Sequence, residues 1–151
     1  MTLGAEPDYT ITKQGLMSNY DLIYIAPEDI DRIWFGVEDY LQRALDRNDG
    51  EYLVSDYYDL IAEGKNQLWI MYGGDIKAAI VTEVYQTPQK KIFDIILLGG
   101  DNMSEWIEPL EEQMTNEAKS QKCDLIKITG RRGWAKMSGF EEKHTTMVKR
   151  L

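Results

Sequence analysis

The chain has 151 residues, of which 43% are hydrophobic and 28% charged, a composition typical of a single globular domain. Its formal net charge is −9, so it lacks the basic surplus of proteins that bind nucleic acid or anionic membranes. The single cysteine, Cys123, excludes an internal disulfide and a cysteine-based zinc site. No apolar run approaches the roughly 20 residues that cross a bilayer, and the N-terminus shows no secretory pattern, so we expect a cytoplasmic protein.

The chain is predicted to form a short arm and one domain. Residues 1–20 mix Gly, Pro, Thr, Ser and Asn without periodicity, and we interpret them as an N-terminal arm. Residues 21–151 carry strand and helix patterns in the order β-α-α-β-β-β-α-β-α-β, with no internal repeat. This order predicts an α/β (α+β) fold with helices on both faces of a mixed sheet, which begins as an antiparallel meander and continues as a β-α-β unit.

One strand and two helices are predicted before the meander, the strand at residues 22–25. Apolar residues recur every three to four positions over residues 30–45, which predicts an amphipathic helix. A shorter helix is expected to start near a Ser55 cap, to bury Tyr58 and to stop at Gly64.

Three consecutive strands are predicted to form the meander. Their patterns cover residues 68–72, 76–85 and 92–98, with turns at 73–75 and 87–90. The third strand is almost continuously apolar, so we expect it inside the sheet with both of its faces covered.

The last third of the chain predicts a helix-strand-helix-strand order. Asn102 or Ser104 is expected to cap a long helix. A strand is predicted at 124–129, a short helix at 134–137 and a final strand at 144–151.

Particular residues give this order a family resemblance. They are Leu97-Leu-Gly-Gly-Asp-Asn-Met-Ser104, where a helix follows the third meander strand directly, then Gly130-Arg-Arg-Gly-Trp134 and Gly139-Phe140. Over about residues 22–151 the chain resembles the GNAT (Gcn5-related N-acetyltransferase) superfamily, and especially the GNAT-like proteins of tailed bacteriophages. The resemblance implies strands that splay after the third meander strand. It also implies, for a phage-encoded protein, a place in the host cytoplasm or the virion.

The resemblance further implies a site for acetyl-CoA or another acyl-CoA in the wedge between the splayed strands. The pantetheine arm would pair with backbone, and the pyrophosphate would lie at the following helix N-terminus, where free N–H groups and the helix dipole favour an anion. The implied cofactor-binding residues are Leu97, Leu98, Gly99, Gly100, Asn102, Met103 and Ser104, with Arg131 and Arg132 as sources of positive charge.

The helix start departs from the family's usual pattern, in which Gln or Arg precedes two spaced glycines. No basic residue precedes this helix, and Asp101, Glu105 and Glu108 crowd its start. Such carboxylates stabilise a helix by ~0.3–1 kcal/mol each and oppose a pyrophosphate at the same place. The segment Gly99–Ser104 can therefore be interpreted either as the start of a well-capped helix or as a CoA site. The tyrosine that many members use as general acid is replaced by Ala135.

Two carboxylates are candidates for a general base, Asp94 on the third meander strand and Glu83 on the strand before it. Asp94 lies in an apolar segment, where a carboxylate needs a partner or a raised pKa, as catalytic groups often have. A solvent-facing strand residue is the competing interpretation. His144, the only histidine, is interpreted as an ordinary strand residue, and we expect no metal site.

Two functions compete at this point. The first is an acyl-CoA-dependent N-acyltransferase that acetylates a small-molecule or protein amine, and the acidic surface suits such a cationic acceptor. The second is a catalytically inactive GNAT-like component of a phage virion or its assembly, acting through a protein partner or as a homo-oligomer. Four Trp and nine Tyr residues motivate the second, because aromatic residues are favoured at interfaces.

Overall fold

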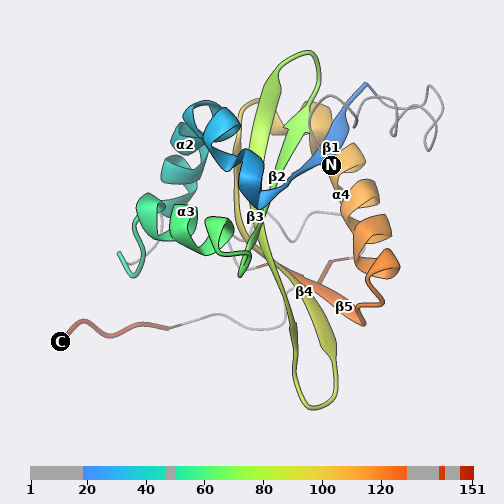
Figure 1. Ribbon diagram of the computed structural model, residues 1–151. Helices are drawn as coiled ribbons and strands as arrows, with labels where there is room; N and C mark the ends of the chain where they lie inside the picture. The colour runs from blue at the N-terminus through green and yellow to red at the C-terminus, as the bar shows by residue number, and fades with distance from the viewer. Residues whose placement is uncertain (1–18, 47–49, 129–139, 142–146) are drawn as a thin grey trace.

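The computed structural model describes residues 19–46, 50–128, 140–141 and 147–151. Within them a five-stranded sheet, in the order β1-β2-β3-β4-β5, separates α2 and α3 on one face from α4 on the other (Figure 1). The pairs from β1 to β4 are antiparallel and the β4–β5 pair is parallel, which confirms the predicted mixed sheet with helices on both faces. The elements are β1 (Asp21–Ile25), the 3-10 helix η1 (Pro27–Asp29), α2 (Ile30–Leu45), α3 (Val54–Ala62), β2 (Gln67–Tyr72), β3 (Ile76–Gln86), β4 (Lys91–Gly100), α4 (Met103–Ser120) and β5 (Leu125–Ile128).

The sheet lies between two apolar cores. The α2-side core is formed between the sheet and helices α2 and α3, and the α4-side core between the sheet and α4. The predicted helical stripes account for both, since residues three or four apart lie on one helix face. The buried stripe of α2 is Ile30, Ile33, Val37, Leu41 and Leu45, and that of α4 is Trp106, Leu110, Met114 and Ala118.

Strand β4 contributes side chains to both cores, and a β-bulge shifts the phase of its alternation after Ile95. Thr82 on β3 lies opposite Ile95, but the preceding Val81 lies opposite Leu97, so Ile96 has no partner on β3. Ile95 therefore packs in the α4-side core, whereas Ile96 and Leu97 both pack in the α2-side core. A bulge of this kind also bends the strand and leaves the backbone of the extra residue outside the ladder.

The end of β4 lies directly against the backbone of α2. A Cβ atom added to Gly99 would lie 2.1 Å from the carbonyl oxygen of Tyr40, and one added to Gly100 would lie 2.6 Å from that of Lys77. Only residues without a side chain permit these approaches. The two glycines thus bring α2 and the start of β3 next to the β4–α4 junction.

The structure corrects the prediction of which residues of α3 face the core. The helix begins at Val54, where the N–H of Leu53 donates to the Asp56 carboxylate (2.7 Å), and not at a Ser55 cap. This start turns Tyr57 into the core, where it is 4% exposed, while the hydroxyl of the half-buried Tyr58 donates to Asp31. The predicted burial of Tyr58 was wrong by one position.

The C-terminal prediction is only partly covered by the structure. Residues 147–151 form no strand and expose Met147 and Val148, so the predicted final strand is wrong for them. The rest of that strand, the predicted helix at 134–137 and most of the predicted arm lie outside the described residues. None of the described helices is both long and apolar enough to span a membrane.

We predict that Gly99→Ala destabilises the fold by roughly 1–3 kcal/mol or more, because its Cβ meets backbone that has no room to move. Gly36→Ala is the matched control. Its Cβ would contact only the flexible end of Ile76 at 3.1 Å, and alanine favours the helix interior, so we expect stability within about 1 kcal/mol of wild type. Urea denaturation measures both, and equal stabilities of the two variants would contradict the packing described.

Candidate functional site

The outer edge of β4 pairs with β5 along its first half. Among the described residues, Ile92–Ile95 pair in parallel with Leu125–Ile128, and the bulge at Ile96 follows directly on β4. In the parts of the chain that the structure describes, no strand pairs with β4 on this side beyond Ile95. The side chains of Leu97 and Leu98 are buried in opposite cores, so any role they have at this edge belongs to their backbone groups.

The N-terminus of α4 follows β4 immediately and is not capped by a side chain. Asn102 is the N-cap residue in a left-handed conformation (φ 55°), and its side chain makes no capping hydrogen bond. The neighbouring Met103 and Ser104 are exposed. The first backbone N–H groups of a helix lack partners within it and lie at the positive end of the helix dipole.

The acidic residues at this helix start are engaged by partners. Asp101 accepts a hydrogen bond from Arg43 of α2 (2.9 Å), and Glu105 accepts one from the Tyr20 hydroxyl (3.0 Å). The Arg43 hydrogen bond holds the pKa of Asp101 below its ordinary value. The sequence shows no basic residue before this helix, and the prediction overlooked the cation that α2 places beside Asp101.

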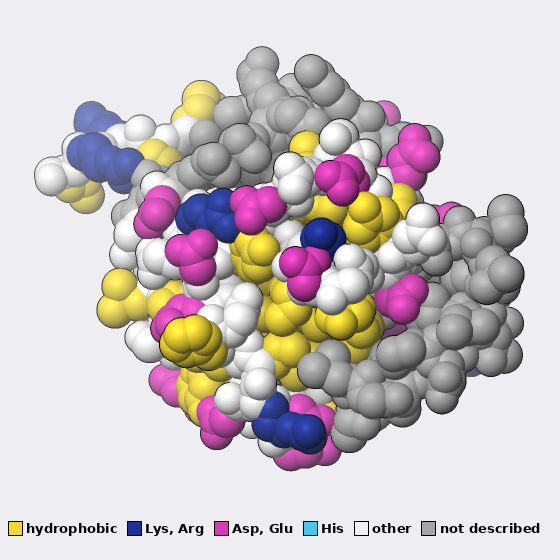
Figure 2. Space-filling view, turned by 90° about the horizontal axis from the view of Figure 1, so that it is seen from above, with side chains coloured by type: hydrophobic (Ala, Val, Ile, Leu, Met, Phe, Trp, Pro, Cys, Tyr) yellow, Lys and Arg dark blue, Asp and Glu magenta, His cyan; other side chains and the backbone are white. Residues whose placement is uncertain are grey.

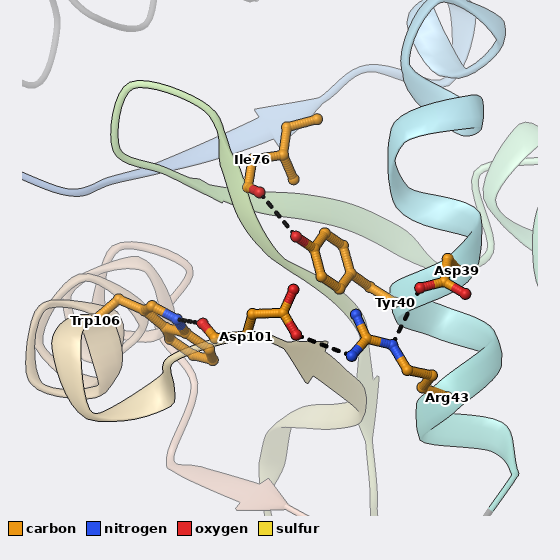
Figure 3. A network of polar contacts seen from close by, with 6 residues as sticks. All are labelled: Asp39, Tyr40, Arg43, Ile76, Asp101 and Trp106. Atoms are coloured by element: carbon orange, nitrogen blue, oxygen red, sulfur yellow. Dashed lines mark hydrogen bonds and ion pairs between the residues drawn. The ribbon is translucent and has the colours of Figure 1, made fainter.

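Arg43 is the centre of a small polar network (Figure 3). Its Nε lies 3.1 Å from Asp39 one helical turn earlier, and its guanidinium stands 5.0 Å from the centre of the Tyr40 ring. The Tyr40 hydroxyl donates to the carbonyl of Ile76 (3.0 Å). The Arg43 and Asp101 side chains are 46% and 54% exposed, and ion pairs of this kind contribute only ~0–1 kcal/mol to stability.

Charge pairing is general on this surface. On the face seen from above, the basic side chains over the body of the molecule lie beside acidic ones, around a central area of apolar side chains (Figure 2). Lys77, for example, lies 2.8 Å from Asp75. It is also close enough to Glu105 for the two charges to interact.

The predicted base candidates lie together on another part of the sheet. Glu83 and Asp94 are directly opposite each other on β3 and β4. Both point to the face that α2 and α3 cover, because their neighbours Phe93, Ile95 and Val84 pack in the α4-side core. Sequence analysis named both carboxylates, and the register shows that they are neighbours.

Asp94 is held by two residues that sequence analysis missed. The Tyr85 hydroxyl donates to Oδ2 of Asp94 (3.2 Å), and Nζ of Lys127 donates to the Tyr85 hydroxyl (3.2 Å). Oδ1 of Asp94 is buried without a hydrogen-bond partner among the described residues. Burial raises the pKa of Asp94, although Tyr85 and Lys127 act in the opposite direction. A carboxylate with a free, buried oxygen and a raised pKa is suited to accept a proton.

Three residues discussed in the sequence analysis are not covered by the structure. Arg131, Arg132 and His144 lie outside the described residues. Within the described ranges, no three His, Cys, Asp or Glu side chains gather into a metal-binding group.

Several solved acetyltransferases share the fold of this chain. An aminoglycoside acetyltransferase from an uncultured soil metagenomic sample, solved in complexes with trehalose and with sisomicin, matches at a TM-score of 0.66 for the trehalose complex, with 10% identity over 87% of this chain and 96% of that one. A GCN5-related N-acetyltransferase from Ralstonia eutropha JMP134 matches at 0.60, with 17% identity over 87% and 98% of the two chains. This protein has the GNAT fold.

A third GNAT-fold structure is a predicted acetyltransferase from Clostridium acetobutylicum solved with acetyl-CoA. It matches at a TM-score of 0.61, with 14% identity over 87% of this chain and 96% of that one. No protein-family profile and no curated protein sequence matches the chain. The predicted GNAT architecture is thus confirmed by its three-dimensional form.

We predict that Asp94→Asn raises the melting temperature near neutral pH. Because burial raises the pKa of Asp94 above its ordinary 3.8, the folded protein binds that proton more tightly than the unfolded chain does. Wild-type stability should therefore fall as the pH rises through the raised pKa, a loss that asparagine avoids. Thermal unfolding between pH 3.5 and 8 measures this difference, which should shrink toward the acidic end. A variant less stable than wild type at neutral pH would contradict the assignment.

Proposed function

We propose that this protein binds an acyl-CoA along the outer edge of β4 and transfers the acyl group to an amine. The observation that carries the proposal is the junction of a bulged strand, whose outer edge has no partner after Ile95 among the described residues, with a helix start at which the N-cap side chain makes no capping hydrogen bond. The shared fold with acetyltransferases, one of them solved with acetyl-CoA, supports it.

The residues at this junction fit a CoA group. The side-chain positions of Gly99 and Gly100 are taken up by the backbone of α2 and β3, so these residues would contact a ligand only through their own backbone groups. The exposed N–H groups of Met103 and Ser104 suit a pyrophosphate. The backbone of Leu97 and Leu98 would hold the pantetheine arm, and Asn102 would lie beside the phosphates. When bound, acetyl-CoA would supply the activated acyl group, and its sulfur would leave as a thiolate that takes a proton from solvent.

In the reaction, the chain's own residues would position the acyl carbonyl and accept a proton from the amine. The backbone N–H of Ile96, which has no partner on β3, is proposed to donate to the acyl carbonyl. Asp94, two residues earlier, takes the proton from the incoming ammonium or amine on its free Oδ1. Tyr85 and Lys127 hold the other oxygen in place. Glu83, opposite Asp94, is the second candidate for this role.

The acceptor is proposed to be a cationic amine. The chain has a net charge of −9, and Asp94 and Glu83 are carboxylates side by side on one face of the sheet. A negatively charged site attracts an ammonium group and raises its local concentration. The sisomicin complex of the aminoglycoside acetyltransferase is consistent with an acceptor of this class.

The test combines binding with turnover. Acetyl-CoA at about 100 times its dissociation constant should stabilise the fold by about 2.7 kcal/mol, read as a higher melting temperature. In an assay of thiol release with a panel of polyamines and aminoglycosides, Asp94→Asn should lower turnover by about 10² or more while the acetyl-CoA-induced shift is retained. Glu83→Gln is the matched control. A larger loss from Glu83→Gln would assign the base to Glu83, and no melting shift at millimolar acetyl-CoA would refute the proposal.

A second candidate is a non-catalytic protein-binding role, such as a component of a phage virion or of its assembly. Phe35 favours it, because this large apolar side chain on α2 is 97% exposed. Sedimentation of wild type and Phe35→Asp separates the two functions. A stable oligomer that Phe35→Asp dissociates, together with no response to acetyl-CoA, would favour the binding role.

A further inference from the structure

The β4–α4 junction lacks a basic residue in its own sequence, yet Arg43 of α2 reaches it from 58 positions away. We propose that Arg43 is the residue that binds the CoA pyrophosphate, and that Asp101 is an intramolecular competitor which occupies Arg43 in the absence of ligand. This inference rests on the proposed function, whose CoA site it completes.

The geometry places Arg43 at the predicted phosphate site. Asp101 directly precedes the N-cap residue Asn102, and Nη1 of Arg43 lies 2.9 Å from its carboxylate. The guanidinium thus contacts the residue that directly precedes the N-cap of α4 (Figure 3). The close approach of Gly99 to the Tyr40 carbonyl holds this part of α2 against the strand end.

The chemistry of the pair allows an exchange of anions. A guanidinium has five N–H donors in a planar fork that matches the oxygens of a phosphate group. In the structure, the Arg43 guanidinium contacts the carboxylate of Asp39 through Nε and that of Asp101 through Nη1. Because the Arg43–Asp101 pair is exposed, giving up one carboxylate costs little, and a pyrophosphate offers a higher charge in return.

Two hydrogen bonds fix the backbone of Asp101 next to the start of α4. The N–H of Asp101 donates to the carbonyl of Lys77 (3.1 Å), and its own carbonyl accepts from the Trp106 indole (2.6 Å). The backbone of Asp101 is thus anchored on β3 and α4, and its side chain is the mobile part. Rotation of that side chain alone releases Arg43 to a ligand.

The experiment is a titration of CoA into wild type, Arg43→Gln, Asp101→Asn and the double variant by isothermal calorimetry. We expect Arg43→Gln to weaken CoA binding about tenfold, the size of one charged hydrogen bond. Asp101→Asn should tighten it about threefold or more, as an exposed competitor is removed. In the Arg43→Gln background, Asp101→Asn should have no effect, because competition requires Arg43.

Two controls separate a binding role from a structural one. Pantetheine has the thiol arm of CoA and no phosphate, so its affinity should be the same in all four proteins. Arg32→Gln removes an equal charge from another exposed ion pair, with Asp29, and should leave CoA binding unchanged. The ligand-free melting temperatures of the four proteins should also agree.

The outcomes are distinguishable from those of the proposed function. CoA binding of equal strength in all four proteins would overturn this inference and leave the function standing. An equal gain from Asp101→Asn with and without Arg43 would show simple repulsion and would overturn the competition. If neither wild type nor Asp101→Asn binds CoA, the proposed function fails and this inference fails with it.

Discussion

The packing of the α2 backbone onto Gly99 is the contact on which the rest of the candidate site depends. A side chain at Gly99 would meet the Tyr40 carbonyl at 2.1 Å, so the close crossing of helix and strand exists only because glycine is there. The same crossing delivers Tyr40 and Arg43 to the end of β4 and lets Arg43 reach Asp101. The absence of a side chain at Gly99 therefore permits both the close packing of α2 on β4 and the contact between Arg43 and Asp101.

The bulge at Ile96 gives β4 two different halves. Before it, the strand pairs on both edges and carries Asp94 on the face covered by α2 and α3. After it, among the described residues, the strand pairs only with β3, and it leads into an uncapped helix start. In the proposed function, the first half would supply the proton acceptor and the second half would bind the phosphates of the cofactor. The acetyltransferase neighbours have the same fold.

The helices and strands that depend on the local spacing of apolar residues could be predicted from the sequence. The stripe from Ile30 to Leu45, the three meander strands and the helix after Gly100 follow from spacing, and the structure confirms them. Features set by tertiary packing were not predictable in the same way. The phase of α3 was missed by one residue, so Tyr58 was assigned to the core in place of Tyr57.

In the candidate site too, single residues could be predicted from the sequence but their partners could not. Asp94 and Glu83 were found because carboxylates in apolar strands are unusual, but their partners Tyr85 and Lys127 depend on strand register. The Arg43–Asp101 pair joins residues far apart in the chain, and no sequence pattern announces it.

The most direct measurement is the change in backbone amide chemical shifts when acetyl-CoA is added to the labelled protein. The account predicts the largest changes at Ile96–Ser104, where the bulged strand passes into α4. Changes confined to α3 and the exposed side of α2 around Phe35, or none at millimolar acetyl-CoA, would contradict it.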